Sequence, residues 1–504
     1  MIGAVEMRRN TSFYIIAIIL ICQLATISSA SERRIASADR ISSGDWIYDA
    51  MISLSADNLV PGMASRVFQG DRLFNRLEMA ELVISILDKS DMNNLTESQQ
   101  SLINKLVIEL KPEIKRSSDT ALDSWDSISA TTAKPVLTGF AQAILSHNTD
   151  GDDSLDIPYH ATGIVDIRGN ILAAGTIADK NTKFFHELRD SSIPDKLFLK
   201  GTDSNFQWTI GKEYMNWSPS YTGSMILSDN SKSFIQLKAV KEIDLGKQLG
   251  RIKLTQFGST FSENGDTFYL FGKRYEKSLS KRLFLGINEV TKTDELPNPL
   301  VAIMPYYLYQ HLFDVNFNIL GSLDLLYQMP SGMQIYTDFM VDDMSASQFF
   351  NLGYKDPKRK TGYTIGTYFP KVLRGDKLST LRIEYLSVDP RTYGPVSGTD
   401  DRLQYTHGSM LIGNNIGPNV NALYIRGEHY FTPKLSIIAE YLNQKQKKKE
   451  EPFRNSSRTI SAQISYDFAA DTSASMRIAP TRVRTPDSGS TTNTAYEIRL
   501  MKSF

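Results

Sequence analysis

Residues 316–341 read NFNILGSLDLLYQMPSGMQIYTDFMV, and hydrophobic and polar residues alternate along both halves of this stretch. Successive side chains of a β-strand point to opposite faces, so each half is typical of a strand with one apolar and one polar face. Pro330-Ser331-Gly332 separates the halves and favours a tight turn. The stretch therefore predicts a β-hairpin. The apolar face of its first strand carries Phe317, Ile319, Leu323, Leu325 and Tyr327.

The same alternation runs from about residue 160 to the C-terminus, for example in TISAQISYDF at residues 459–468. Strands of this kind occur in soluble β-sandwiches and also in outer-membrane barrels. The alternation alone therefore predicts an all-β domain and leaves both folds open.

The lengths of the connections favour a membrane barrel. Long connections fall at residues 291–315, 343–360, 389–421, 443–457 and 481–494. Short ones fall at residues 277–280, 330–332, 374–376, 431–433 and near Ala470. Outer-membrane barrels have short periplasmic turns and longer extracellular loops, which gives this regular asymmetry. We therefore predict a transmembrane barrel of about 18 antiparallel strands over residues 158–504, with the long loops extracellular.

The C-terminal segment AYEIRLMKSF fits the last strand of such a barrel. Its final aromatic, Phe504, resembles the signal that outer-membrane proteins present to the barrel assembly machinery. We expect Lys502 to interrupt an otherwise lipid-facing series by extending its amine toward the interface. The other members of that series are Tyr496, Ile498, Leu500 and Phe504.

Residues 1–30 have the layout of a secretory signal peptide. Arg8 and Arg9 precede a short apolar run at residues 12–24, and Ser28-Ser29-Ala30 offers a small-residue cleavage site. A retained membrane anchor is the alternative, although the run is short for a spanning helix. The single cysteine, Cys22, lies in the run, so the mature chain would contain no disulfide.

Residues 31–116 predict a small α-helical periplasmic domain, and residues 117–157 predict a linker. Asn75 and Glu78 have the spacing of a capping box at the start of a helix. The Trp46-Ile47-Tyr48 opening, the Gly70-Asp71 turn and NRLEMA at residues 75–80 resemble one S-layer homology repeat. That resemblance implies docking to a peptidoglycan-linked polymer. A plain helical hairpin is the alternative.

Composition and motifs give no sign of an enzyme. Lys+Arg and Asp+Glu both number 56, so bulk charge does not favour nucleic acid as a partner. A phosphate-binding glycine loop, an HExxH motif and a GxSxG motif are all missing from the sequence. The 6 histidines lack metal-ligand spacing. We therefore predict neither a cofactor nor a metal, with a barrel hydrolase or acyltransferase as a minor alternative.

Several segments at predicted strand ends resemble the capsule assembly protein family called Wzi, over roughly residues 205–430. The matching segments are residues 211–230, FMVDD at 339–343, Lys273-Arg274-Tyr275, Asn288-Glu289 and Tyr405-Thr406-His407. The resemblance implies an outer-membrane barrel that binds capsular polysaccharide or exopolysaccharide at the cell surface, in contact with outer-membrane lipid and lipopolysaccharide. A porin or channel for solutes or oligosaccharides is the alternative.

Sugars stack their apolar ring faces on aromatic side chains and present hydroxyls to carboxylates and amides. The segments supply such groups, and we take them as candidate polysaccharide contacts. The alternative for each is a structural role in the polar network of a barrel lumen. The candidates are Trp217, Tyr221, Asp229, Asn230, Glu289, Asp342, Asp343 and His407.

Overall fold

The computed structural model describes residues 35–504 apart from a set of internal segments. Those segments are residues 91–93, 119–134, 152, 168–170, 179–195, 204–205, 264, 314, 316, 343–359, 374–377, 395–400, 409, 447–455 and 486–488. The predicted signal peptide lies outside the described residues.

One antiparallel sheet of 19 strands, counted over the described residues, closes into a barrel. β2 and β3 both pair with β1, so they form two pieces of one strand and the barrel has 18 strands, as predicted. The first half of the sheet consists of β1 (Val136–Asn148), β2 (Asp153–Asp156), β3 (Tyr159–Asp166), β4 (Ile171–Ala178), β5 (Lys196–Asp203), β6 (Phe206–Glu213), β7 (Phe234–Asp244), β8 (Arg251–Glu263), β9 (Asp266–Ser278) and β10 (Leu283–Thr293). The second half consists of β11 (Asn318–Gln328), β12 (Gln334–Asp342), β13 (Thr361–Phe369), β14 (Ser379–Val388), β17 (Val420–Thr432), β18 (Leu435–Gln446), β19 (Ser456–Ala469), β20 (Thr472–Thr485) and β21 (Gly489–Ser503).

The C-terminal strand closes the barrel against the first one. β21 pairs antiparallel with β1, with Ala143 opposite Leu500. Gly139 and Phe504 then exchange two backbone hydrogen bonds of 3.0 Å each. The first and last strands of the described sheet thus pair with each other and leave no terminal strand, as a lipid environment requires. The side chains of Tyr496, Ile498, Leu500 and Phe504 are exposed on the outer face.

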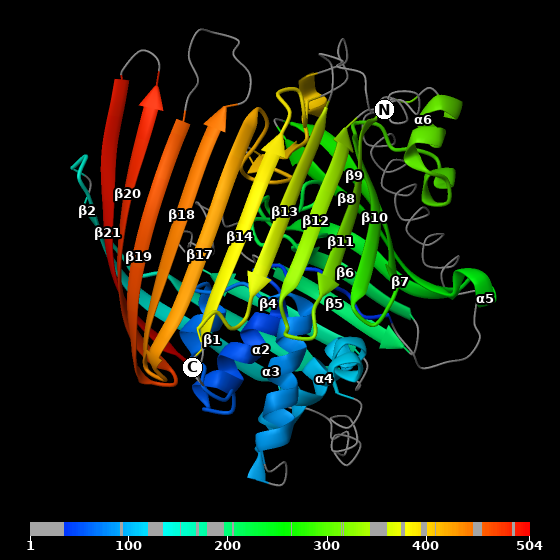
Figure 1. Cartoon of the computed structure of the whole chain (residues 1–504). Helices are drawn as coiled ribbons and strands as arrows, with labels where there is room; N and C mark the ends of the chain where they lie inside the picture. Colours follow the sequence, from blue (N-terminus) through cyan, green and yellow to red (C-terminus); the bar gives the residue numbers. More distant parts are fainter. Residues whose placement is uncertain are drawn as a thin grey trace.

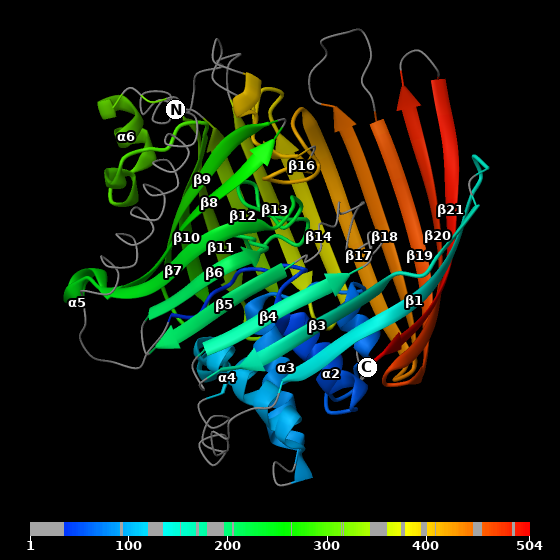
Figure 2. The ribbon, with the colours of Figure 1, turned by 180° about the vertical axis from the view of Figure 1, so that it is seen from behind.

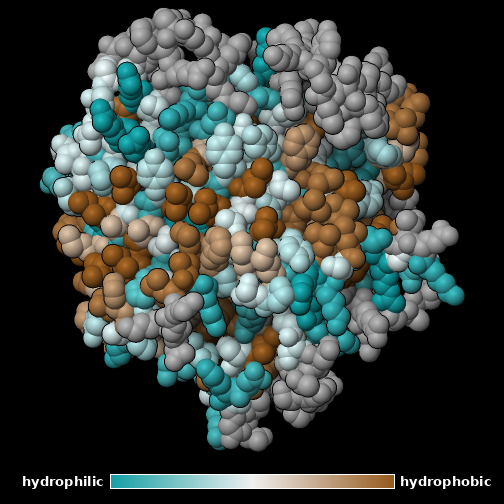
Figure 3. All heavy atoms as spheres, in the orientation of Figure 1, coloured by the Kyte–Doolittle hydropathy of each residue, from teal (hydrophilic) through white to brown (hydrophobic). Residues whose placement is uncertain are grey.

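Alternation along the strands separates an apolar outer face from a polar inner face. In the β11–β12 hairpin, Leu323 and Tyr327 are exposed on the outside, whereas Asp324 and Asp338 are buried inside the barrel. Figure 3 shows hydrophobic side chains spread across the middle of the wall. This is the pattern of a barrel whose outer surface faces lipid.

Short turns and long connections lie at opposite ends of the barrel, as Figure 1 shows. Two connections differ from the sequence prediction. Residues 481–494, predicted as a long loop, belong mostly to the β20–β21 hairpin, in which Thr485 pairs with Gly489. A tight turn also joins β8 to β9 at the long-loop end, where Glu263 pairs with Asp266.

The predicted start of the barrel at residue 158 leaves out β1 and β2. Residues 117–157 were expected to form a linker, yet Val136 already begins β1 and Asp153 begins β2. The alternation typical of strands is difficult to recognise here, because β2 is short and the region has mixed polarity. The strand is also interrupted between Asp156 and Tyr159.

Residues 35–90 and 94–118, which we call the plug, carry most of the helices. They include α2 (Trp46–Ala56), η1 (Ser65–Gln69), α3 (Arg76–Lys89) and α4 (Glu97–Ser117). Asn75 and Glu78 form the predicted capping box at the start of α3. A second capping box, formed by Thr96 and Gln99, starts α4. No helix among the described residues is long and apolar enough to cross a membrane.

The plug closes the short-turn end of the barrel (Figures 1 and 2). Its apolar core includes Trp46 and Phe74, and it continues into Phe140, Ile164 and Phe198 on the inner side of the wall. The helices therefore share a core with the barrel and do not form the separate domain that the sequence suggested. Helical residues that resemble an S-layer repeat are buried in this contact.

Shorter elements lie in the connections between strands at both ends of the barrel and outside the wall. They are α5 (Gly246–Leu249), η3 (Pro299–Ala302), α6 (Tyr306–Phe313), η4 (Asp401–Leu403), β15 (Thr406–His407) and β16 (Met410–Leu411).

Candidate functional site

The connection between β6 and β7 folds into the barrel instead of projecting from it. We call residues 214–233 the first inner loop, and nearly all of its side chains are buried. Met225, Ile226 and Leu227 belong to an apolar cluster that includes Phe257 and Leu270 on the inner face of the wall. This segment contains the residues on which the Wzi resemblance mainly rests.

The connection between β14 and β17 packs on the first inner loop. We call its described part, residues 389–394 and 401–419, the second inner loop. The hydroxyl of Tyr393 donates to the carbonyl oxygen of Met225 at 2.7 Å, and that of Tyr405 donates to Ile226 at 2.8 Å. The two tyrosine rings are stacked with their centroids 6.1 Å apart. These contacts fix the two inner loops to each other across the lumen.

Carboxylates on the wall hold the backbones of both inner loops. Glu384 of β14 accepts hydrogen bonds from the backbone N–H groups of Tyr221 at 2.6 Å and Thr222 at 2.9 Å. Asp342 of β12 accepts from the N–H of Tyr393 at 2.6 Å. Hydrogen bonds to an ionised carboxylate are stronger than neutral ones. The loops are therefore anchored to the wall by charge-assisted bonds.

Asp229 joins the first inner loop to the plug. Its carboxylate forms an ion pair with the guanidinium of Arg40, and both side chains are less than a tenth exposed. Asp229 also accepts from the backbone N–H of Ser43 at 2.6 Å. A second bond from Arg40 reaches the carbonyl oxygen of Ser220 at 3.2 Å. One buried ion pair thus connects the first inner loop, which enters from the long-loop end, to the plug at the short-turn end.

Two aromatic candidates pack inside this network. Trp217 lies edge-on to Phe257 with ring centroids 5.4 Å apart. Tyr221 stacks on Tyr424 at 5.8 Å, and the guanidinium of Arg382 lies 4.8 Å from its ring. Both rings are buried and Tyr221 already has partners on its faces, so a sugar would have to displace protein groups to stack there.

His407 lies on the β15–β16 hairpin near the surface of the second inner loop. Its ring centroid is 4.9 Å from that of Phe234 and 4.5 Å from that of Phe261. Burial lowers the pKa of His407 to about 4, with the nearby charge of Lys232 contributing in the same direction. The imidazole is therefore neutral at pH 7.

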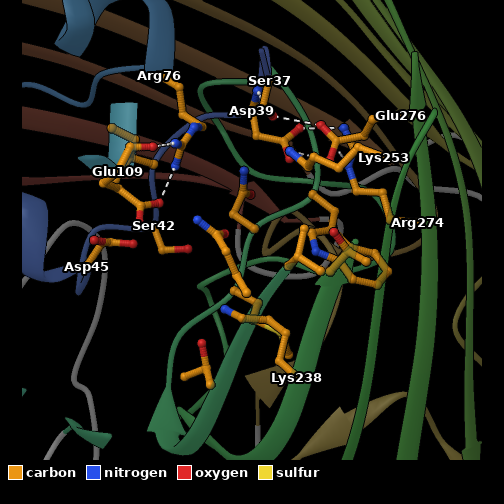
Figure 4. A pocket seen from close by; sticks show the side chains of 18 of the residues that line it. Ser37, Asp39, Ser42, Asp45, Arg76, Glu109, Lys238, Lys253, Arg274 and Glu276 are labelled. Carbon is orange, nitrogen blue, oxygen red and sulfur yellow. Dashed lines mark hydrogen bonds and ion pairs between the residues drawn. The ribbon is translucent and has the colours of Figure 1, made fainter. Parts of the chain in front are cut away.

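The lumen between the plug and the wall contains a cavity of about 160 Å³. Figure 4 shows Arg76 and Glu109 pointing at each other on one side, and Lys253, Arg274 and Glu276 on the other. Arg76 Nη1 is 3.0 Å from Glu109 Oε1, and Lys253 Nζ is 2.7 Å from Glu276 Oε2. These charges are paired with one another, as expected of a polar boundary between two packed parts of a protein.

The family model of the capsule assembly protein Wzi matches residues 191–496. The chain belongs to this family. Among solved structures, Wzi from Escherichia coli covers 91% of this chain and 98% of its own, with a TM-score of 0.51 and 13% identity. It is described as an outer-membrane protein involved in group 1 capsule assembly and as a carbohydrate-binding β-barrel.

OprD from Pseudomonas aeruginosa covers 74% of this Wzi-family chain and 95% of its own, with a TM-score of 0.43 and 14% identity. No curated protein matches the chain.

The structure divides the candidate residues of this Wzi-family protein into groups. Trp217, Tyr221, Asp229 and Asp342 are buried in the contacts among wall, plug and inner loops. The carboxylates of Asp229 and Asp342 bind protein partners, and the rings of Trp217 and Tyr221 pack against other side chains.

Asn230 and His407 come together near the rim and are only half-buried. Asn230 donates its side-chain amide to the carbonyl oxygen of Leu411 at 3.1 Å, next to the β15–β16 hairpin. Glu289 does not join them, because it faces outward from β10 and accepts from the backbone N–H of Tyr307 at 3.1 Å. Asp343 lies outside the described residues.

Sequence reasoning missed the groups that organise the site. Glu384, Tyr393, Tyr405 and Arg40 make most of its long-range polar contacts. Glu384 could have been found from the sequence, because it is a charged residue at an inward position of a strand and such a residue needs a partner. The identity of that partner depends on a loop 163 residues away.

Within the described part of the chain, three or more His, Cys, Asp or Glu side chains nowhere gather as a metal site.

Proposed function

We propose that this protein is a non-enzymatic outer-membrane barrel that binds and retains capsular polysaccharide or exopolysaccharide at the cell surface. The observation that carries the proposal is the Wzi family match across residues 191–496. The related barrel from Escherichia coli is named as a carbohydrate-binding protein of capsule assembly. The same role suits the present chain, which has a similar barrel and helical segment.

The filled lumen supports adhesion over transport. Plug and inner loops are joined through Arg40 and Asp229, and wall carboxylates such as Glu384 hold the loops. A channel requires a continuous water path, and this network of buried contacts lies across it. A protein that holds a polymer at its rim needs no such path.

We place the glycan contacts at the long-loop rim, where Asn230, His407 and the β15–β16 hairpin lie. An amide and a neutral imidazole can donate to and accept from sugar hydroxyls. The buried candidates, including Trp217 and Asp342, would act indirectly by holding the inner loops in place. This assignment keeps two of the predicted contacts and gives the buried ones a supporting role.

The proposal includes an orientation. The long loops face the exterior and the plug faces the periplasm, where the exposed side of its helices would meet a peptidoglycan-linked polymer. Export would use a signal peptide cleaved near Ala30, and the barrel assembly machinery would insert the barrel by recognising Phe504. Lipopolysaccharide and phospholipid would surround the outer face of the wall.

A capsule-retention assay tests the function. We expect deletion of the gene to move surface polysaccharide from the cell-bound fraction into the medium, and the wild-type gene to restore it. His407→Ala should release polysaccharide several-fold more than wild type at equal barrel abundance. His147→Ala is the matched control, because His147 is an exposed histidine at the same end of the barrel.

Unchanged cell-bound polysaccharide in the complete deletion would refute the proposed function. Equal release by the two histidine variants would refute the assignment of the contacts to the second inner loop.

A further inference from the structure

The long connection between β10 and β11 lies against the outside of the barrel wall. Its elements η3 and α6 pack on Tyr269 and Phe271 of β9 and on Phe317 and Ile319. These positions alternate with inward residues such as Leu270, which packs in the lumen cluster. Figures 1 and 2 show α6 beside the wall near β9 and β10. We call η3 and α6 together the outer strap.

The outer strap satisfies polar side chains that point out of the wall. Gln256 of β8 donates to the carbonyl oxygen of Ala302 at 2.7 Å. Lys273 of β9 donates to the carbonyl oxygen of Val301 at 2.8 Å and also to Met304. Because Gln256 and Lys273 are both buried, the strap shields them from the surroundings of the wall.

Two further contacts fix α6 at this position. Glu289 of β10 accepts from the backbone N–H of Tyr307 in the first turn of α6 at 3.1 Å. The amine of Lys273 lies 4.1 Å from the ring centroid of Tyr306. Polar side chains on the lipid side of a membrane barrel are unfavourable unless they are covered. The strap therefore has a definite place on the wall and covers a polar patch there.

The opposite side of the outer strap is also apolar. Ile303 is 55% exposed, Leu308 47% and Leu312 61%. Figure 3 shows hydrophobic side chains over this part of the molecule. A helix that carries apolar side chains on opposite sides suits a buried or lipid-embedded position. Water is therefore an unfavourable environment for this exposed side.

The exposed side of the strap is continuous with the lipid-facing wall. Glu289, which holds α6, pairs with Gly321 on β11. The next outward pair along the same strands is Ile287 and Leu323, and both are exposed on the outer face. Two residues of a strand span only about 7 Å. The anchored end of α6 thus lies next to side chains that face lipid.

We propose that the outer strap is embedded in the outer leaflet of the membrane, where its exposed side binds lipid acyl chains. The polar contacts on its inner side and the apolar groups on its outer side suit a segment between the wall and hydrocarbon. The strap belongs to a connection that the sequence analysis assigned to an extracellular loop. Its partner is the lipid that surrounds the barrel, independently of any glycan.

Spin labelling of the full-length protein in dioleoylphosphatidylcholine vesicles tests this proposal. A nitroxide is attached in turn to Leu308→Cys, Leu312→Cys, Ile287→Cys and Arg402→Cys, and the only native cysteine, Cys22, is removed with the proposed signal peptide. Collision rates are measured with molecular oxygen, which enters hydrocarbon, and with a water-soluble nickel chelate. Ile287 is the lipid-facing control and Arg402, 51% exposed at the rim, is the aqueous control.

We expect labels at 308 and 312 to collide preferentially with oxygen, as the label at 287 does, with the reverse preference at 402. Preferential collision with nickel would place α6 in water and overturn the proposal. Protection from both reagents would show that a second copy or another protein covers α6, which also overturns it. Two exposed label positions keep the result readable if one substitution disturbs the barrel.

Discussion

Buried carboxylates in this barrel act as acceptors for loop backbones, and this distinguishes them from ligand-binding groups at a surface. Glu384 illustrates the role, because it binds Tyr221 and Thr222 through their N–H groups and also accepts from the hydroxyl of Tyr336 at 2.6 Å. Removing such an acceptor leaves buried donors unsatisfied, which costs more than the net value of one hydrogen bond.

Glu384→Gln is therefore expected to lower the free energy of opening of the first inner loop by about 2–4 kcal/mol. The reason is that a neutral amide replaces the carboxylate that accepts from two backbone N–H groups. Hydrogen exchange of the amides of Tyr221 and Thr222 measures the effect, and both should lose protection. Glu497→Gln is the matched control, because Glu497 is only partly buried and pairs with Arg499 within its own strand. Unchanged protection at residues 221 and 222 in Glu384→Gln would contradict the anchoring role.

Buried ion pairs hold the helices of the plug to the strands of the wall. Asp49 of α2 pairs with Lys196 of β5 and with His160 Nε2 of β3 at 2.8 Å. Burial opposes ionisation of Asp49, but Lys196 and His160 outweigh it and lower its pKa to about 2. A lowered carboxyl pKa adds stability above the ordinary pKa near 4, and this stability is lost as the pH falls toward 2.

Asp49→Asn should weaken docking of the plug by about 3–5 kcal/mol at pH 7, because it leaves Lys196 buried without its partner. In planar bilayers we expect no steady ion current through the wild-type protein and intermittent openings in the variant. Wild-type openings should appear only as the pH falls from about 4 to 2, whereas those of the variant should depend little on pH in that range. Asp88→Asn, on the exposed side of α3, is the control and should stay closed. A steady wild-type current at pH 7 would favour a channel.

The sequence predicted the strands and helices better than the positions of the loops between them. Alternation such as that at residues 316–341 depends on local geometry, so the hairpin and its outward face are confirmed. The capping box of α3 is also local and is confirmed. The inward course of residues 214–233 depends on partners such as Glu384, Tyr393 and Tyr405, which the chain supplies far away. Sequence periodicity does not reveal contacts between residues that lie so far apart in the chain.

The same limit explains the site residues. Aromatic and carboxylate groups at residues 217–229 fit a sugar site by type, yet burial decides whether they can reach a sugar. Glu289 was predicted as a mouth residue because a strand was expected to end there, but it lies within β10, faces outward and is covered by α6. Residue type was thus readable from the sequence, and accessibility was not.

At the scale of the whole molecule, plug, wall and inner loops form one closed body with a rim on the long-loop side. Family membership connects this body to capsule assembly. On this basis we expect the closed barrel to bind polysaccharide directly.

Direct binding is measured with the purified full-length protein in lipid nanodiscs and polysaccharide purified from the surface of the same cells. Biolayer interferometry should show saturable binding that excess free polysaccharide competes away. His407→Ala should weaken this binding several-fold and His147→Ala should leave it unchanged. Absence of saturable binding to the cells' own polysaccharide by a correctly folded barrel would contradict direct binding.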